Sequence, residues 1–338
     1  MKKKCVLFKS KERFDEFYKK LALYDIETKV LDFDSLDWID YDYSTVDYVI
    51  YYPSFEFTSN HPNALQRVID NLKYIHSINN NLVIFPEPKI LDYYNDKYRQ
   101  FLFLNKNNYH IPKTIPLLSK QALEKASEEL GYPMVVKNRY GAGGGYVFKV
   151  ENYKQLEALY ELSMLNYSSL DGVKQVLKDL TNKEFYYRWL KAKKLTYPFL
   201  SKPLLAQKFV KIEKDLKTVC VNNKVVEGHW RRQANPEMWK MNIDDGGVGE
   251  WSYIPESAIL ESEKLASALG AKWLNIDLII SGENYYISEF SPVWHHYLYK
   301  EKDSFVYKDD YNIDMPLQDS LDLSKIIIES FHTTANNV

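Results

Sequence analysis

The sequence predicts an α/β protein, in which a domain of alternating strands and helices precedes two α+β regions. Three observations predict this class. Short apolar runs alternate with amphipathic helical runs over the first 90 residues, and a glycine-rich segment at 132–150 joins two strand-like runs. From residue 204 onward strand-like runs predominate. At 338 residues the chain is long enough for two or three domains.

The first 90 residues alternate strand and helix in a regular way. Strand-like runs lie at 5–8, 28–33, 47–52 and 81–85, and helical runs at 11–23 and 63–78. Such alternation is typical of a mostly parallel sheet covered by helices. None of the strand-to-helix turns carries a G-x-G-x-x-G pattern, so we do not expect a dinucleotide site in this domain.

The rest of the chain divides into a mixed region and a strand-rich region. Residues 91–138 have the pattern helix, strand, helix, strand, with prolines between the elements, and 152–200 are mainly helical. We expect strands at 204–210, 216–221, 225–232, 274–280 and 284–290, and helices at 255–270 and 317–331.

Composition excludes several classes of protein. The 44 basic and 46 acidic residues nearly cancel, so no overall charge favours nucleic acid or an anionic membrane as a partner. No apolar run reaches membrane-spanning length or matches the core of a signal peptide, and we expect a cytoplasmic protein. Cys5 and Cys220 lie in apolar strands and are predicted to be reduced core residues, a redox pair being the alternative. The sequence leaves open whether the protein forms a homo-oligomer.

The glycine-rich segment follows a lysine at the end of an apolar strand. Lys137 precedes Gly141 and the run Gly143–Gly145, and a second strand-like run follows. The segment is therefore predicted to be a hairpin turn, unlike the phosphate loops that open a helix. Its N–H groups and the lysine could bind phosphate, while a surface turn with a solvent-directed lysine is the alternative.

Two carboxylates are predicted to face each other near the C-terminal end of the strand-rich region. If Gly282–Asn284 form a three-residue turn, Ser281 pairs with Tyr285, Ile279 with Ile287 and Asp277 with Glu289. Like charges in this position repel each other, and Mg²⁺ between them would remove the repulsion. Ser291 points to the same face. The alternative is a protonated or solvent-separated pair.

Three further features could complete a nucleotide site. The edge of the strand at Lys208–Val210 could bind a flat base, alternation places Asp215 and Lys217 on one face, and Arg231 and Arg232 suit a carboxylate or phosphate. Each of these features alone is also typical of a solvated face.

Taken in order, these elements resemble the ATP-grasp superfamily over residues 85–295, and within it the glutamate-ligase branch of carboxylate–amine ligases. The matching stretches are "NDKYRQF", "GYPMVVKNRYGAGGGYVFKV", "KDLKTVCVNNKVVEGHWRR" and "NIDLIISGENYYISEFS". The resemblance implies a pre-ATP-grasp α/β domain at 1–90 and two α+β lobes that clamp ATP. The first lobe, with the glycine segment and a helical insert, lies within 91–203, and the second lies at 204–338.

The resemblance also implies roles for individual residues. The implied ATP-binding residues are Lys97, Lys137, Gly141, Gly143, Gly144, Gly145, Gln207, Lys208, Phe209, Val210 and Glu213. Arg231, Arg232 and Lys217, which stands where arginine is usual, are the implied catalytic residues. Asp277, Glu289 and Ser291 are the implied ligands for one or two Mg²⁺ ions, with serine in place of the usual asparagine. Asn242, His295 and His296 are expected to contact substrate.

The implied reaction is ATP-dependent formation of an amide or peptide bond through an acyl phosphate. The expected substrate is an amino acid, a peptide or another small metabolite. Three alternatives remain: a degenerate ATP-grasp protein that binds nucleotide as a sensor or partner, a phosphotransferase acting on a hydroxyl, and an α/β protein outside the superfamily. Ser291 favours the first of these alternatives.

Overall fold

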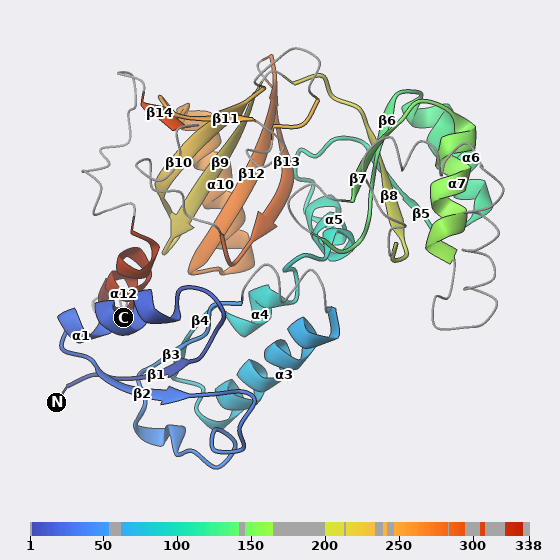
Figure 1. Cartoon of the computed structure of the whole chain (residues 1–338). Helices are drawn as coiled ribbons and strands as arrows, with labels where there is room; N and C mark the ends of the chain where they lie inside the picture. Colours follow the sequence, from blue (N-terminus) through green and yellow to red (C-terminus); the bar gives the residue numbers. More distant parts are fainter. Residues whose placement is uncertain are drawn as a thin grey trace. The chain divides into compact units, whose positions relative to one another are not determined.

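The chain forms two compact units, Met1–Tyr94 with Ile212–Val338, and Asn95–Lys211 (Figure 1). The computed structural model describes residues 2–53, 62–141, 146–164, 200–212, 214–233, 239–241, 247–282, 284–294, 305–307 and 322–333. Within these ranges no helix has the length and apolar character that a membrane span requires.

A four-stranded parallel sheet begins the chain, as the βα alternation predicts. Its strands are β1 (Lys4–Phe8), β2 (Glu27–Leu31), β3 (Tyr48–Ile50) and β4 (Val83–Phe85), in the order β2-β1-β3-β4. The two crossovers run in opposite directions along the sheet, so α1 (Phe14–Leu23) and α3 (Pro62–Ile78) cover opposite faces. A 3₁₀ turn (Tyr43–Thr45) and the short helix α4 (Pro88–Leu91) complete the domain.

The second sheet of this unit has six strands in the order β13-β12-β9-β10-β11-β14. They are β9 (Lys214–Val221), β10 (Lys224–Arg232), β11 (Val248–Trp251), β12 (Trp273–Ser281), β13 (Asn284–Ser291) and β14 (Phe305–Tyr307). Four of them match predicted strands. The short strands β11 and β14 were not predicted, because their sequences show no clear alternation of apolar and polar residues. Helix α10 (Glu256–Leu269) packs against one face through buried Ala258, Leu265 and Ala266 (Figure 1).

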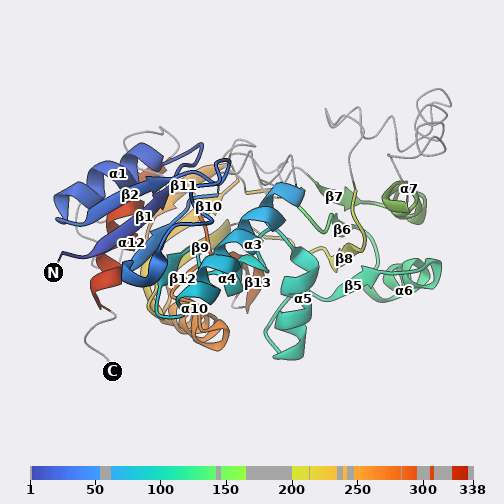
Figure 2. The same ribbon diagram turned by 90° about the horizontal axis from the view of Figure 1, so that it is seen from below.

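One hydrophobic core joins the two sheets of this unit. Phe85 of β4 lies edge-on to Trp273 of β12, with ring centroids 5.2 Å apart. The final helix α12 (Leu323–Thr333) lies beside α1 (Figure 2), and its Phe331 stacks on Tyr48 at 4.6 Å. The C-terminal segment therefore contributes to the core of the N-terminal domain.

The sheet face opposite α10 changes from apolar to charged along its strands. Val221 and Trp273 are paired neighbours at one end and are buried in the shared core. Four residues further along each strand, alternation keeps the side chains on the same face, and the strands reach Lys217 and Asp277, which are also paired. The charged half of this face is where the candidate site lies.

The second unit is built on a four-stranded antiparallel sheet in the order β5-β8-β6-β7. Its elements are α5 (Lys97–Lys106), β5 (Thr114–Leu117), α6 (Lys120–Leu130), β6 (Met134–Lys137), β7 (Val147–Val150), α7 (Tyr153–Met164) and β8 (Leu204–Lys208). Because β8 pairs with β5 and β6, it belongs to this unit, although the predicted boundary at residue 204 groups it with the later strands. The three predicted domain ranges otherwise stay a prediction.

Candidate functional site

Asp277 on β12 and Glu289 on β13 are directly opposite each other, which confirms the pairing predicted for the two carboxylates. The predicted turn, however, is one residue too long. β12 ends at Ser281 and β13 begins at Asn284, so two residues separate the strands. Gly282 occupies the first of these positions with φ +60°, a conformation that tight hairpin turns require and glycine adopts without strain.

The shorter turn changes the strand pairs near it, and a bulge then restores the register. The predicted pairs Ser281–Tyr285 and Ile279–Ile287 are wrong, and the observed pairs are Ser281–Asn284 and Ile279–Tyr286. The register shifts between Asp277 and Leu278, where Ser288 is the extra residue on β13. The bulge returns Glu289 to its position opposite Asp277.

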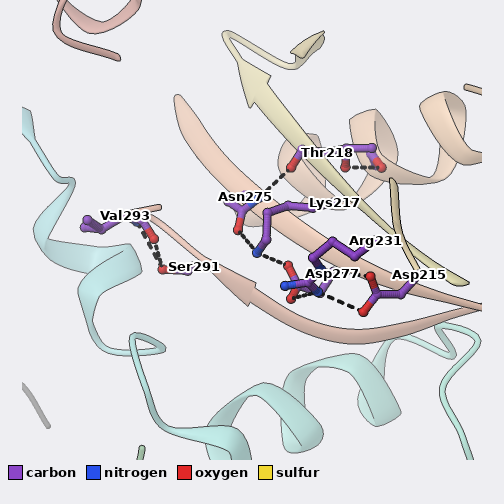
Figure 3. A network of polar contacts seen from close by, with 9 residues as sticks. Asp215, Lys217, Thr218, Arg231, Asn275, Asp277, Ser291 and Val293 are labelled. Carbon is purple, nitrogen blue, oxygen red and sulfur yellow. Dashed lines mark hydrogen bonds and ion pairs between the residues drawn. The ribbon is translucent and has the colours of Figure 1, made fainter. Parts of the chain in front are cut away.

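Two cations surround the Asp277 carboxylate (Figure 3). The Lys217 ammonium donates to Oδ1 of Asp277, and Nη2 of Arg231 donates to Oδ2 at 3.0 Å. Burial by itself raises the pKa of Asp277, but the two cations outweigh this effect and lower the pKa to about 2. Asp277 is therefore ionised at neutral pH and already has a partner on each oxygen.

Arg231 is held mainly by Asp215, its neighbour across β9 and β10. Nε donates to one Asp215 oxygen and Nη2 to the other, both at 2.8 Å, and each side chain is only 12% exposed. Burial by itself lowers the pKa of Arg231, but Asp215 and Asp277 raise it above the ordinary value. The predicted grouping of Asp215 with Lys217 on one face is confirmed by the register.

Arg232 does not reach Asp215 or Asp277. It follows Arg231 on the same strand, so its side chain points to the other face of the sheet. Nε of Arg232 lies 3.7 Å from Glu250, and the side chain is 49% exposed. The structure therefore brings one of the two predicted arginines to the carboxylates, and the catalytic role of each stays a prediction.

Ser291 lies beyond Glu289 on the same face, but its hydroxyl is engaged locally. It donates to the carbonyl of Val293 and accepts from the Val293 amide at 3.1 Å. The residue opposite Ser291 is Asn275, which is 3% exposed and accepts from the Lys217 ammonium at 2.9 Å (Figure 3). Sequence reasoning missed Asn275, although its position two residues before Asp277 places it on the same strand face.

The carboxylate pair offers the kind of oxygen ligands that Mg²⁺ prefers. Across the described part of the chain no group of three or more His, Cys, Asp and Glu residues could hold a metal ion. Protein sites for Mg²⁺ often provide only one or two carboxylates, however, with phosphate and water oxygens completing the shell. Asp277 and Glu289 fit such a shared site in the chemistry of their donors.

In the second unit, β6 and β7 lie on either side of the glycine segment in the sequence and pair antiparallel, which confirms the predicted hairpin. Lys137 is the last residue of β6, and Gly141 has φ +120°. Lys97, the first residue of α5, donates through its ammonium to the Gly141 carbonyl and through its backbone amide to the carbonyl of Arg139 at 3.0 Å. The two predicted nucleotide lysines thus lie at the start of α5 and at the end of β6, and Lys97 contacts the first residue of the glycine segment.

Asp96 and Arg139 fasten the same two elements together. Asp96 caps α5 by accepting from the Arg99 amide at 3.1 Å. It also accepts from Nε of Arg139 at 3.0 Å and from Nη2 at 2.7 Å. The guanidinium lies 5.5 Å from the ring centre of Tyr98 and 5.0 Å from that of Tyr140. The N-cap position of Asp96 is visible in the sequence, but its ion pair with Arg139 is not.

The remaining predicted site residues divide by whether the structure describes them. Gln207 and Lys208 end β8, Gln207 donates to the Thr114 hydroxyl at 3.0 Å, and the Phe209 ring centre lies 5.1 Å from the Lys149 ammonium. Val210 follows them and is half-buried. Gly143, Gly144, Gly145, Glu213, Asn242, His295 and His296 lie outside the described residues.

Known proteins share this architecture. D-alanyl-alanine synthetase A from Vibrio cholerae superposes with a TM-score of 0.59 over 99% of both chains, at 12% identity. The ATP-grasp ligase PsnB, solved with a minimal precursor, gives a TM-score of 0.57 over 98% of this chain and all of its own, at 12% identity. At these identities the likeness establishes the fold.

Sequence comparison leads to the same family. The tetrahydromethanopterin:α-L-glutamate ligase of Methanocaldococcus jannaschii is 25% identical over 231 residues, 67% of each chain. Residues 94–294 match the RimK-like ATP-grasp domain, which is more than half of the chain and includes the candidate residues described in each unit. The chain therefore belongs to the RimK-like ATP-grasp family and is an ATP-dependent ligase.

Proposed function

We propose that this ligase joins a carboxylate to an amine through an acyl phosphate, with an amino acid, a peptide or a small metabolite as substrate. A substrate carboxylate oxygen attacks the γ-phosphorus of ATP, and ADP leaves. The amine nitrogen then attacks the carbonyl carbon of the acyl phosphate. A C–N bond forms as the C–O bond to the phosphate breaks, phosphate leaves, and the nitrogen loses a proton.

The charge arrangement around Asp277 carries this proposal. Phosphoryl transfer requires cations fixed in advance around the transferred group, because negative charge must be neutralised where it develops. Lys217 and Arg231 are two such cations, and both lie against a carboxylate that faces Glu289. We assign Lys217 and Arg231 to the transferred phosphoryl group.

The second unit supplies the residues proposed for the nucleotide. Lys97 and Lys137 contact the phosphates, and the segment that begins at Gly141 covers them and excludes water, which would otherwise hydrolyse the acyl phosphate. Gln207–Val210 contact the adenine base. The position of both lysines beside the glycine hairpin supports these roles.

Mg²⁺, as one or two ions, is proposed to bind Asp277 and Glu289, where it supplies further charge neutralisation for the phosphates. The two facing carboxylates support this assignment, since their mutual repulsion is relieved by a cation. Asp215 keeps Arg231 oriented beside them.

The substrate class is proposed from the known relatives. One is a ligase of glutamate, another was solved with a precursor peptide, and a third is a D-alanyl-alanine synthetase, so amino acid and peptide substrates are the first to test. We keep the expectations of a cytoplasmic location and of no nucleic-acid or membrane partner. Homo-oligomerisation stays open.

A second candidate function is nucleotide binding without ligation, as a sensor or a partner of another enzyme. One observation favours it: the Ser291 hydroxyl both donates to and accepts from the backbone of Val293. This engagement leaves less capacity for a metal at the position where the family pattern has asparagine.

The test is incubation of purified protein and ATP·Mg with a panel of amino acids and peptides, and with metabolite extract. ADP release together with a new mass equal to two metabolites minus water supports the ligase. A phosphorylated product without free phosphate identifies a phosphotransferase. Tight ATP binding in a titration, without ADP release under any condition, supports the sensor and overturns the ligase proposal.

A further inference from the structure

Asn275 connects the backbone of the six-stranded sheet to the charged cluster, which consists of Asp215, Lys217, Arg231 and Asp277 (Figure 3). Its Nδ2 donates to the Thr218 carbonyl at 2.9 Å, and its Oδ1 accepts from the Lys217 ammonium at 2.9 Å. At 3% exposure the amide is buried, and these two bonds fix both of its ends. Asn275 thus presents a neutral oxygen to Lys217 in a fixed direction.

Lysine needs such an oxygen more than arginine does. A guanidinium holds a carboxylate through two parallel hydrogen bonds and is oriented by that contact alone. An ammonium is a point charge on a flexible four-carbon stem, so contact with a single carboxylate oxygen leaves the stem free to rotate. Lys217 is 15% exposed and has Asp277 and Asn275 as partners on two sides.

A cation that binds Asp277 changes these two contacts differently. The negative charge that attracts Lys217 is then shared with the cation, and the two positive charges repel each other. The attraction of Lys217 to the neutral Asn275 oxygen does not depend on that charge. Asn275 is therefore the contact that keeps the ammonium within the cluster when Asp277 is occupied.

We propose that Asn275 is a positioning residue for Lys217, and that this pair performs the role that the family pattern assigns to arginine. This inference rests on the proposed ligase function, in which Lys217 neutralises the transferred phosphoryl group. It identifies a linked pair of substitutions: a lysine at position 217 requires an oxygen acceptor at position 275, whereas an arginine does not.

A double-mutant cycle tests this dependence, with binding of Mg·AMPPNP, a non-hydrolysable ATP analogue that keeps the γ-phosphate, measured by isothermal titration. We expect Asn275→Ala to weaken Mg·AMPPNP binding by about tenfold when residue 217 is lysine. In the Lys217→Arg background, the same substitution is expected to weaken binding by less than about twofold. Equal losses in the two backgrounds would mean that Asn275 acts independently of Lys217 and would overturn the proposal.

Two further variants separate positioning from general stability. Asn275→Asp keeps the acceptor for Lys217 but removes the donor to Thr218, so it is expected to bind Mg·AMPPNP more tightly than Asn275→Ala. Ser262→Ala removes a buried hydroxyl that contacts Thr218 on the α10 side of the sheet at 2.8 Å, and serves as the control. It should lower the melting temperature without changing Mg·AMPPNP affinity.

The outcomes remain distinguishable from failure of the proposed function. If no substrate yields a condensed product, the ligase proposal fails, but the cycle on Mg·AMPPNP binding still reports whether positions 217 and 275 are coupled. Losses in Asn275→Asp equal to those in Asn275→Ala would assign the effect to the Thr218 contact and contradict the positioning role. Where ligation is measurable, we expect Asn275→Ala to lower kcat and Lys217→Arg to restore it.

Discussion

Two aspartate–arginine pairs, one in each unit, have similar hydrogen bonds and different surroundings. In the Asp215–Arg231 pair both side chains are 12% exposed, and the pair shares its charge with Asp277 and Lys217. In the Asp96–Arg139 pair the arginine is 22% exposed and lies between two tyrosine rings. The first pair joins neighbouring strands of one sheet, whereas the second joins a helix cap to a hairpin 43 residues later.

The difference shows how the candidate residues of each unit are held in place. Residues of the six-stranded sheet are fixed by strand register, so charged side chains that share a face must neutralise one another. The start of the glycine segment lies outside the strands, so strand register does not fix it. The ion pair between Arg139 and Asp96, the N-cap residue of α5, fixes it instead. We therefore expect substitutions in the Asp215–Arg231 pair to destabilise the fold of their unit. Substitutions in the Asp96–Arg139 pair are expected to displace the start of the glycine segment.

The largest effect is expected for Arg231→Met. This substitution leaves the Asp215 and Asp277 carboxylates buried with less positive charge nearby, which costs about 3–5 kcal/mol of unfolding free energy. Urea unfolding followed by circular dichroism measures the loss. The matched control is Arg232→Met, because Arg232 is the next residue and is 49% exposed; its loss should stay below about 1 kcal/mol. Similar losses for the two variants would contradict the account of the cluster.

The next effect is a dependence of stability on pH through Asp277. Burial raises the pKa of this carboxyl, but Lys217 and Arg231 lower it to about 2, below the value of about 3.9 in an unfolded chain. Its contribution is therefore present above pH 4 and is lost as the pH falls toward 2.

Urea unfolding in the presence of EDTA, at several pH values between 6 and 2, measures this dependence. The gap in unfolding free energy between wild type and Asp277→Asn should narrow by roughly 2 kcal/mol as the pH falls toward 2. A gap that does not change with pH would mean that Asp277 keeps an ordinary pKa in the fold.

A smaller effect is expected for Arg139→Ala. Asp96 then loses its hydrogen bonds from Arg139 but keeps the one from the Arg99 amide, so we expect a loss of about 1–2 kcal/mol in unfolding free energy and a higher KM for ATP. Thermal unfolding and ATP turnover measure the two effects.

Arg99→Ala is the matched control for this variant, because its side chain lies 3.4 Å from the same carboxylate and is 45% exposed. It should cost less than about 1 kcal/mol and leave the KM for ATP unchanged. An unchanged KM in Arg139→Ala would show that the pair does not position the glycine segment.

The sequence predicted the candidate residues of the six-stranded sheet better than the rest, for physical reasons. Side-chain alternation has a fixed period, so spacing alone could place Asp215 and Lys217 on one face, and Asp277 opposite Glu289. That Asp277 lies beside Lys217 depends on the pairing of β12 with β9, which spacing does not give. The Asp277–Glu289 pair was predicted correctly although two details were wrong: a turn one residue shorter than expected is offset by the bulge at Ser288. Turn length and bulges depend on local backbone geometry that alternation does not encode.

Contacts between distant elements could not be predicted in the same way. Nothing local in "NDKY" or "KNRYG" indicates that Asp96 and Arg139 meet, since their contact depends on how α5 packs beside the β6–β7 hairpin. Asn275 was missed because asparagine in a strand carries no charge pattern, and its role appears only once Lys217 is seen beside it. The roles assigned to the residues at 143–145, 213, 242, 295 and 296 stay predictions.

The most direct test of the account compares wild type with Glu289→Ala, in a mass-spectrometric assay of ATP-dependent condensation. The account predicts that wild type releases ADP and forms a product whose mass equals two substrates minus water. It predicts that Glu289→Ala does neither while its circular dichroism spectrum is unchanged. Undiminished ADP release and product formation by Glu289→Ala would contradict the central place given to the carboxylate hairpin.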